Sequence, residues 1–165
     1  MIRKDYFVPE NMKTIVESHS SGLGGVGVIG GVIGPGTDLA IIGGSWVTMT
    51  IQLADEAGHV FDQQTAKKVC IAVATGAGAF MVGTKIAATA FGWLGAVFTG
   101  GLSIAAAAAG NAALNYSFTK AYGYSCSRYF LQTEKIHNSE VLVSILICMM
   151  GAELGIDMGS NENVA

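Results

Sequence analysis

A chain of 165 residues, 51% of them hydrophobic and 13% charged, is long enough for one domain with a sizeable core, but it carries only about half the charge of an ordinary soluble domain. Its net charge is −3 and its nine Lys and Arg residues are scattered, which excludes the basic surface of a nucleic-acid-binding protein. The composition predicts either a membrane-associated protein or a subunit that buries much of its surface against copies of itself.

The N-terminal part predicts a short helix over residues 9–18, because Pro9 suits the first helical position. Residues 20–36 contain eight glycines, which favour helix poorly, and they are expected to form a separate glycine-rich entry segment. The next helix is expected to run to about Ala57, with Gly58 as its stop signal. A proline-glycine turn followed by an N-cap side chain predicts a structural cap at its start, formed by Pro35, Gly36, Thr37 and Asp38.

Two long helices are predicted in the middle of the chain. Asp62 is expected to cap a helix that runs to about Ala90, and the sequence FGW at residues 91–93 indicates a break. A further helix is expected over about residues 99–134, with Gly123 as a candidate interruption.

The last predicted helix covers residues 138–154, where Asn138 or Ser139 is expected to provide the cap, and a tail follows over 155–165. No stretch alternates apolar and polar residues as a strand would. The predicted fold is therefore a single all-α domain over 1–165, an antiparallel bundle of four to five helices with Ala/Gly-rich, closely packed central helices.

A long uncharged run leaves two environments open. No Lys, Arg, Asp or Glu occurs from Ile86 to Phe118, which is too long for one membrane span of about 20 residues and too short for two spans with a turn. The run is rich in Ala, Gly, Ser and Thr, which insert less well than Leu or Ile. Membrane insertion and burial in a soluble assembly both explain it. Small residues recurring at a spacing of four predict a helix-packing face, made of Gly92, Ala96, Gly100, Ala106 and Gly110.

Motifs for nucleotide and metal sites are incomplete. Residues 22–27 match the G-x-G-x-x-G pattern, but no strand is predicted before them, and the chain lacks a P-loop. The three cysteines are far apart in apolar surroundings, so all of them are expected to be buried free thiols rather than zinc ligands: Cys70, Cys126 and Cys148. No catalytic residue, metal ligand or cofactor is therefore predicted.

The histidines are expected to be solvated or capping residues, because they lie near predicted helix ends: His19, His59 and His137. Only convergence of a histidine with a carboxylate or with Ser45 would favour a hydrolase. Lys85 and Lys120 interrupt apolar helices, and each is expected either to reach solvent along its aliphatic stem or to form a buried pair with a carboxylate. Aromatic residues crowd into 116–130, which predicts a core-facing or subunit-facing stripe, with an interfacial membrane belt as the main alternative.

The block from Ile33 to Phe130 resembles a known family. The sequence IGPGTDL opens a helix, AGH forms a glycine turn, and an Ala/Gly-rich helical pair interrupted by FGWLGA ends in KAYGYSCSRYF. This pattern resembles the helical domain of YcjF-type bacterial proteins, in which a proline-glycine-x-aspartate turn similarly opens a helix. The resemblance covers about 100 residues, within a family-like core over 37–134. The same kind of domain follows Era-like GTPase modules in other proteins, and since this sequence contains no such module, a GTPase would be a separate partner.

The sequence thus predicts a non-enzymatic, self-associating helical module at the cytoplasmic membrane, acting as a scaffold or as an accessory to a GTPase or stress system. The alternative is a soluble cytosolic homo-oligomer that forms a ring, shell or filament. Copies of the chain itself, membrane lipid and a separate GTPase are the expected partners, and nucleic acid is not. The first residues lack the apolar core of a signal peptide, so a cytoplasmic location or the cytoplasmic face of the inner membrane is expected, and secretion is not.

Overall fold

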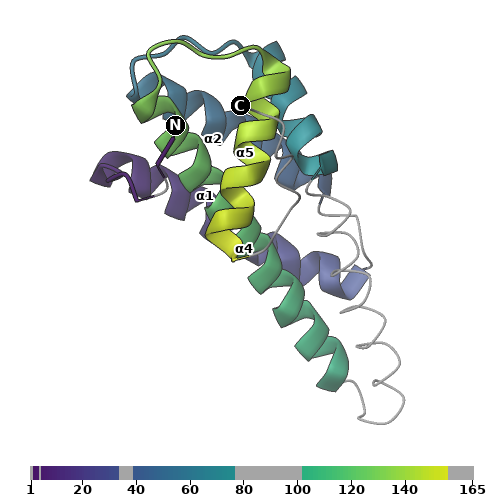
Figure 1. Cartoon of the computed structure of the whole chain (residues 1–165). Helices are drawn as coiled ribbons and strands as arrows, with labels where there is room; N and C mark the ends of the chain where they lie inside the picture. Colours follow the sequence, from purple (N-terminus) through teal and green to yellow (C-terminus); the bar gives the residue numbers. More distant parts are fainter. Residues whose placement is uncertain (1, 4, 34–38, 77–101, 156–165) are drawn as a thin grey trace.

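The computed structural model describes residues 2–3, 5–33, 39–76 and 102–155 of the chain. The helices pack against one another as an all-α bundle, which confirms the predicted fold class (Figure 1). Within the described ranges every regular element is an α-helix: α1 (Glu10–Ile33), α2 (Leu39–Glu56), residues 63–76, α4 (Leu102–Gln132) and α5 (Ser139–Leu154).

Several predicted features lie outside the described residues, and they stay predictions. These are the cap residues Pro35, Gly36, Thr37 and Asp38, the packing positions Gly92, Ala96 and Gly100, the charge at Lys85, the break at 91–93 and the tail beyond Gly155.

α1 is one helix of 24 residues, and the expectation that it ends near Ser18 is wrong. The glycines after Ser18 continue the helix to Ile33 because α1 lies along α4, and among α1, α2, α4 and α5 this is the most extensive contact between two helices. A Cβ atom at Gly24 would lie 3.8 Å from the carbonyl oxygen of Ala112 and from Cβ of Tyr116. Glycine therefore allows the two backbones to approach, and packing against α4 offsets the poor helix propensity of this stretch.

The predicted stop and cap signals after α2 are confirmed. Gly58 has the left-handed φ of 78°, and the amide of His59 donates to the carbonyl of Ala54 at 2.9 Å, which closes the helix end. Asp62 Oδ1 accepts from the amide of Thr65 at 2.9 Å and so caps the helix over 63–76.

The predicted cap of α5 is also confirmed. Asn138 accepts from the amide of Val141 at 3.0 Å, and Gly155 ends α5 in the left-handed conformation. α4 runs without a break through Gly123, so the candidate interruption there is wrong. Gly123 is needed for packing instead, since a Cβ atom at this position would lie 2.8 Å from Cγ2 of Val16 and 3.0 Å from the sulfur of Met49.

The core is centred on a stacked pair of aromatic rings. Trp46 and Tyr122 lie with ring centroids 4.2 Å apart and planes 9° from parallel, and both side chains are completely buried. Trp46 Nε1 donates to Thr119 Oγ1 at 3.0 Å, and the hydroxyl of Tyr122 lies 2.7 Å from Thr50 Oγ1. The buried polar groups of both rings are therefore satisfied across helices, which fixes how α2 sits on α4.

Two of the three cysteines are buried free thiols, as predicted, and the third is not. Cys70 Sγ lies 3.2 Å from the hydroxyl of Tyr122, and Cys126 is completely buried on α4. Burial raises the pKa of both thiols, so both are protonated and unreactive at neutral pH. Cys148 is exposed on α5, because it occupies the outward side of that helix.

The bundle has two distinct ends. The loops over 57–62 and 133–138 lie side by side at one of them, called the loop end, where His59 Nε2 donates to the carbonyl of Phe130 at 2.8 Å (Figure 1). α1 begins near the loop end, since Asn11 bonds the carboxylate of Glu56 at the finish of α2. The other end, called the far end, contains the finish of α1 and the beginning of α4.

Candidate functional site

Charged side chains occupy only one part of each helix that leads to the far end. In α1 the last charged residue is Glu17, in α2 the first is Asp55, and in α4 the first is Lys120. Because α1 runs toward the far end while α2 and α4 run away from it, the uncharged parts of all three helices lie at that same end (Figure 1). The charges of α1 and α4 begin at the same height along the bundle, whereas α2 carries its first charges only at the loop end, where Glu56 contacts Asn11.

An ion pair marks this height. Lys120 Nζ lies 2.7 Å from Glu17 Oε1, so the last charge of α1 pairs with the first charge of α4. The hydroxyl of Tyr116 donates to the other carboxylate oxygen at 2.9 Å and accepts from Lys120 at 3.0 Å, and Tyr124 donates to Glu17 at 3.3 Å. The hydrogen bond and charge of Lys120 lower the pKa of Glu17, and those of Glu17 raise the pKa of Lys120.

Lys120 was expected to reach solvent or to form a buried pair, and the structure combines parts of both. It has a carboxylate partner, but the two side chains are 36% and 40% exposed, so the pair is at the surface rather than buried. The aliphatic stem of Lys120 extends along α4, and its ammonium group lies 5.1 Å from the ring centroid of Tyr116.

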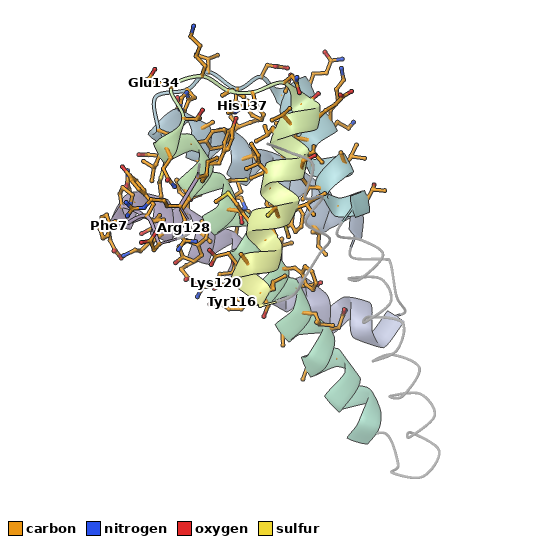
Figure 2. All side chains as sticks on the ribbon, in the orientation of Figure 1. Phe7, Tyr116, Lys120, Arg128, Glu134 and His137 are labelled. Carbon is orange, nitrogen blue, oxygen red and sulfur yellow. The ribbon has the colours of Figure 1, made fainter. Side chains whose placement is uncertain are left out.

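Four residues follow one another at every fourth position of α4 and form one row, called the ladder: Tyr116, Lys120, Tyr124 and Arg128. Figure 2 labels Tyr116, Lys120 and Arg128 along this helix. Each cation of the ladder lies over the preceding tyrosine, since Arg128 is 5.5 Å from the ring centroid of Tyr124. Arg128 also pairs with Glu153 of α5. The carboxylates of Glu17 and Glu153 balance the two cations of the ladder, so no net charge is left there to hold an anionic ligand.

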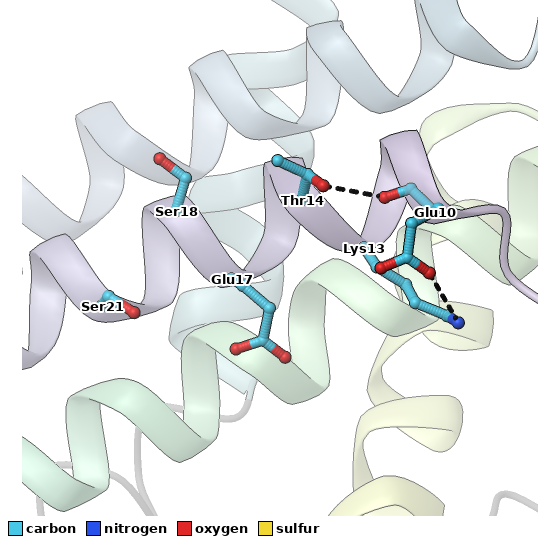
Figure 3. A pocket seen from close by; sticks show the side chains of 6 residues that line it. All are labelled: Glu10, Lys13, Thr14, Glu17, Ser18 and Ser21. Atoms are coloured by element: carbon cyan, nitrogen blue, oxygen red, sulfur yellow. Dashed lines mark hydrogen bonds and ion pairs between the residues drawn. The ribbon is translucent and has the colours of Figure 1, made fainter.

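A shallow groove of about 380 Å³ runs along α1 beside the ladder (Figure 3). Thr14 in this groove donates to the carbonyl of Glu10, and Lys13 pairs with the Glu10 carboxylate at 3.2 Å. Its hydroxyls and charges resemble an ordinary solvated helix surface, and the described residues contain no group of His, Cys, Asp and Glu suited to a metal ion. The groove is lined by Glu10, Lys13, Thr14, Glu17, Ser18 and Ser21.

His19 and Ser45 meet between α1 and α2, which is the convergence that would favour a hydrolase. Nδ1 of His19 lies 2.7 Å from Ser45 Oγ, and Nε2 lies 3.0 Å from Oε1 of Gln52. Because Oε1 can only accept, Nε2 carries a proton, and Nδ1 of the neutral ring is then free to accept from the serine. The arrangement resembles a nucleophile, a base and an orienting group.

An acyl-transfer site also needs donors for an oxyanion. Ser45 lies inside α2, so the amides around it are engaged in helical hydrogen bonds and cannot serve as oxyanion donors. The groove described above is lined by α1 residues other than His19. Together with the bond between Asn11 and Glu56, the contacts of His19 form a polar seam that joins α1 to α2.

The other two histidines lie at the loop end and match the predicted capping or solvated roles, since His59 caps α4 and His137 is exposed. His59 donates to a carbonyl in the last turn of α4, where helix carbonyls lack internal partners. His137 Nδ1 lies 2.8 Å from the hydroxyl of Tyr129, and its backbone amide donates to the same hydroxyl.

The predicted packing face is only partly within the described residues. Ala106 and Gly110 both belong to α4, and a Cβ atom at Gly110 would meet no described atom within 4 Å. The glycines at which described helices come close are Gly24, Gly76 and Gly123, and none of them was predicted as a packing position. Glu17 was also missed. The spacing of Tyr116, Lys120, Tyr124 and Arg128 was the available signal for the ladder.

Replacing Glu17 tests the ion pair. Glu17→Gln is expected to lower the free energy of unfolding at pH 7 by about 1 kcal/mol or less, since exposed pairs are screened by solvent. The pKa of Glu17 is lowered by folding, so its contribution is present above the ordinary value of 4.5 and is lost as the pH falls below it. In urea titrations, the difference in unfolding free energy between the variant and wild type should therefore be present at neutral pH and disappear at acidic pH. Glu10→Gln, which removes an exposed pair within one helix, is the matched control.

No family model, curated protein or solved structure matches the chain. Among the described helices, none combines the length and the apolar character needed to cross a bilayer.

Proposed function

We propose that the protein is a non-enzymatic, self-associating helical module that attaches to a membrane by its uncharged far end. The restriction of charge to one part of α1, α2 and α4 carries this proposal. The uncharged parts of α1 and α4 beyond the pair of Glu17 and Lys120 are roughly 16 residues long, which at 1.5 Å per residue is about 24 Å. This length suits partial entry into the apolar layer of a bilayer, whose thickness is about 30 Å.

The ladder supports the same orientation. Tyrosines are enriched where membrane meets water because the ring is apolar and the hydroxyl is polar, and lysines near that boundary extend toward water. Tyr116 and Lys120 lie where the uncharged part of α4 ends, and their polar atoms are bonded to Glu17. In this arrangement the loop end faces water.

We further propose that the protein lies at the cytoplasmic face of the membrane and that a separate GTPase is its partner. Both proposals are based on the resemblance to YcjF-type proteins.

Vesicle flotation tests the membrane proposal. The full chain is expected to float with phospholipid vesicles and to need detergent rather than carbonate for release. Ala109→Glu introduces a charge at an exposed position of the uncharged part of α4. It should weaken binding tenfold or more, since a carboxylate at the bilayer centre costs about 2.5–3.5 kcal/mol. Gln64→Glu, an exposed position near the loop end, is the control and should float like wild type.

The flotation result also separates the membrane proposal from its alternative. A protein that stays at the bottom of the gradient and scatters light as a large, uniform particle without detergent would support the soluble ring, shell or filament. A dilute monomer in detergent-free buffer would contradict both readings, because a chain of this composition would then expose its apolar surface to water.

The contact between His19 and Ser45 favours a hydrolase as the second candidate. In that case Ser45 Oγ would attack an activated acyl or phosphonyl centre and displace its leaving group, which is fluoride for a fluorophosphonate, while the serine proton passes to His19 Nδ1. We expect no reaction, because the helix around Ser45 offers no oxyanion donors. A fluorophosphonate probe should label wild type no more than Ser45→Ala, as read by mass spectrometry. Labelling of wild type that is lost in both Ser45→Ala and His19→Ala would establish the hydrolase instead.

A further inference from the structure

Two neighbouring helices present an outward surface that fits a second copy of the chain. The helix over 63–76 exposes Ile71, which is 56% accessible, and α5 exposes Cys148. After Ser139 at its start, the exposed positions of α5 recur at every fourth residue and are small apart from the first of these: Glu140, Ser144, Cys148 and Ala152. The exposed positions of the other helix include Lys67, Lys68, Ile71 and Thr75. These eight residues are called the lateral face.

The two helices of the lateral face lie side by side and run in the same direction. Both start at the loop end, after the loops over 57–62 and 133–138 (Figure 1). A Cβ atom at Gly76 would meet the flexible end of the Ile147 side chain, so the two helices approach each other at this point. This contact gives a common reference point for height along the two helices.

Charges on the lateral face occupy one level. Counting back from the contact between Gly76 and Ile147, Lys68 and Lys67 are eight and nine residues away, and Glu140 is seven residues away. At 1.5 Å per residue these positions differ in height by only about 2–3 Å. Among the described residues no ion pair joins either lysine to Glu140. Cations on one helix and a carboxylate on its neighbour therefore lie at the same height and face outward.

We propose that the lateral face binds the lateral face of a second copy about a two-fold axis parallel to the helices. Such an axis places each helix over 63–76 against α5 of the other copy, so the lysines of each chain meet Glu140 of the other. Two equivalent sets of ion pairs form at the loop end. Ile71 and the small residues of α5 pack between the helices below them. A surface that is complementary to itself in this way is the usual basis of a symmetric dimer.

This inference rests on the proposed function for its orientation and names the surface by which the module self-associates. A two-fold axis parallel to the helices keeps both far ends on the same side, and one flat bilayer requires this. An axis perpendicular to the helices would turn the two far ends in opposite directions and would bring Lys67 and Lys68 away from Glu140.

Cysteine crosslinking tests the proposed interface. Cys70 and Cys126 are at most 1% exposed, so Cys148 is the exposed thiol among them. The full chain, bound to vesicles or in buffer, is treated with a flexible bismaleimide longer than one helix diameter of about 10 Å. Wild type is expected to give a covalent dimer, and Cys148→Ser is expected to give none.

Charge reversal identifies the contact. Glu140→Lys alone, or Lys67→Glu with Lys68→Glu, should lower the dimer yield about tenfold, because like charges then face each other. Combining all three substitutions should restore the yield, and a restored yield also rules out misfolding as the cause of the loss. Lys135→Glu, an exposed reversal in the loop over 133–138, is the control and should leave the yield unchanged.

The outcomes separate this inference from the membrane proposal. A wild type that floats with vesicles but gives no Cys148 crosslink overturns the lateral face and leaves membrane attachment in place. A wild type that crosslinks in buffer and responds to charge reversal, but does not float, supports the lateral face and contradicts membrane attachment. A dimer yield that ignores all the reversals overturns the proposed contact.

Discussion

Trp46→Ala is expected to lower the free energy of unfolding by about 3–5 kcal/mol. The indole is completely buried and stacks on Tyr122 with ring centroids 4.2 Å apart, so its removal leaves a cavity between α2 and α4. Thr119 also loses the donor that lies 3.0 Å from its hydroxyl. Urea unfolding followed by far-ultraviolet circular dichroism gives the loss directly, because the helical signal does not depend on Trp46.

Two further substitutions show how much of the lost unfolding free energy comes from the ring of Trp46 and how much from its hydrogen bond. Trp46→Phe keeps a ring against Tyr122 but removes the hydrogen bond to Thr119, and it should cost clearly less than alanine. Thr48→Ala, at an exposed position on the same helix, should change stability by no more than about 0.5 kcal/mol. A loss for Trp46→Ala as small as that of Thr48→Ala would contradict the central position given to the stacked pair.

Sequence reasoning succeeded where the signal is local. Asp62 and Asn138 cap the helices that follow them, and Gly58 ends α2, because each acts on backbone groups within a few residues of itself. Sequence reasoning failed where packing against a helix far away in the chain determines the local structure. The glycines after Ser18 read as a break, yet α1 continues through them because α4 packs along it, and α4 lies about ninety residues further along the chain.

The candidate site follows the same division. The spacing of Tyr116, Lys120, Tyr124 and Arg128 is visible in the sequence, since every fourth residue of a helix shares one side. The part played by Glu17 is not visible in the sequence, because the hydrogen bond from Tyr116 to Glu17 joins residues 99 positions apart. The contact between His19 and Ser45 also depends on how α1 packs against α2. From the sequence, this contact could be stated only as the observation that would favour a hydrolase, and it could not be predicted.

Gly123→Ala is expected to destabilise the protein by about 1–3 kcal/mol, although alanine is the better helix former. The added methyl would lie 2.8 and 2.9 Å from the two methyls of Val16 and 3.0 Å from the sulfur of Met49. Val16 and Met49 are themselves completely buried, so neither can move away without disturbing the contact of α1 and α2 with α4. The cost of overfilling this point exceeds the gain of up to about 1 kcal/mol from helix propensity.

Gly22→Ala is the matched control, because Gly22 also lies within a helix but a Cβ atom there would meet no described atom within 4 Å. With no collision, the propensity term acts alone, and this variant should be up to about 1 kcal/mol more stable than wild type. The two substitutions add the same methyl group and are expected to move the urea midpoint in opposite directions. A rise in midpoint for Gly123→Ala would mean that α1 and α4 do not approach as closely at this point as the structure has them.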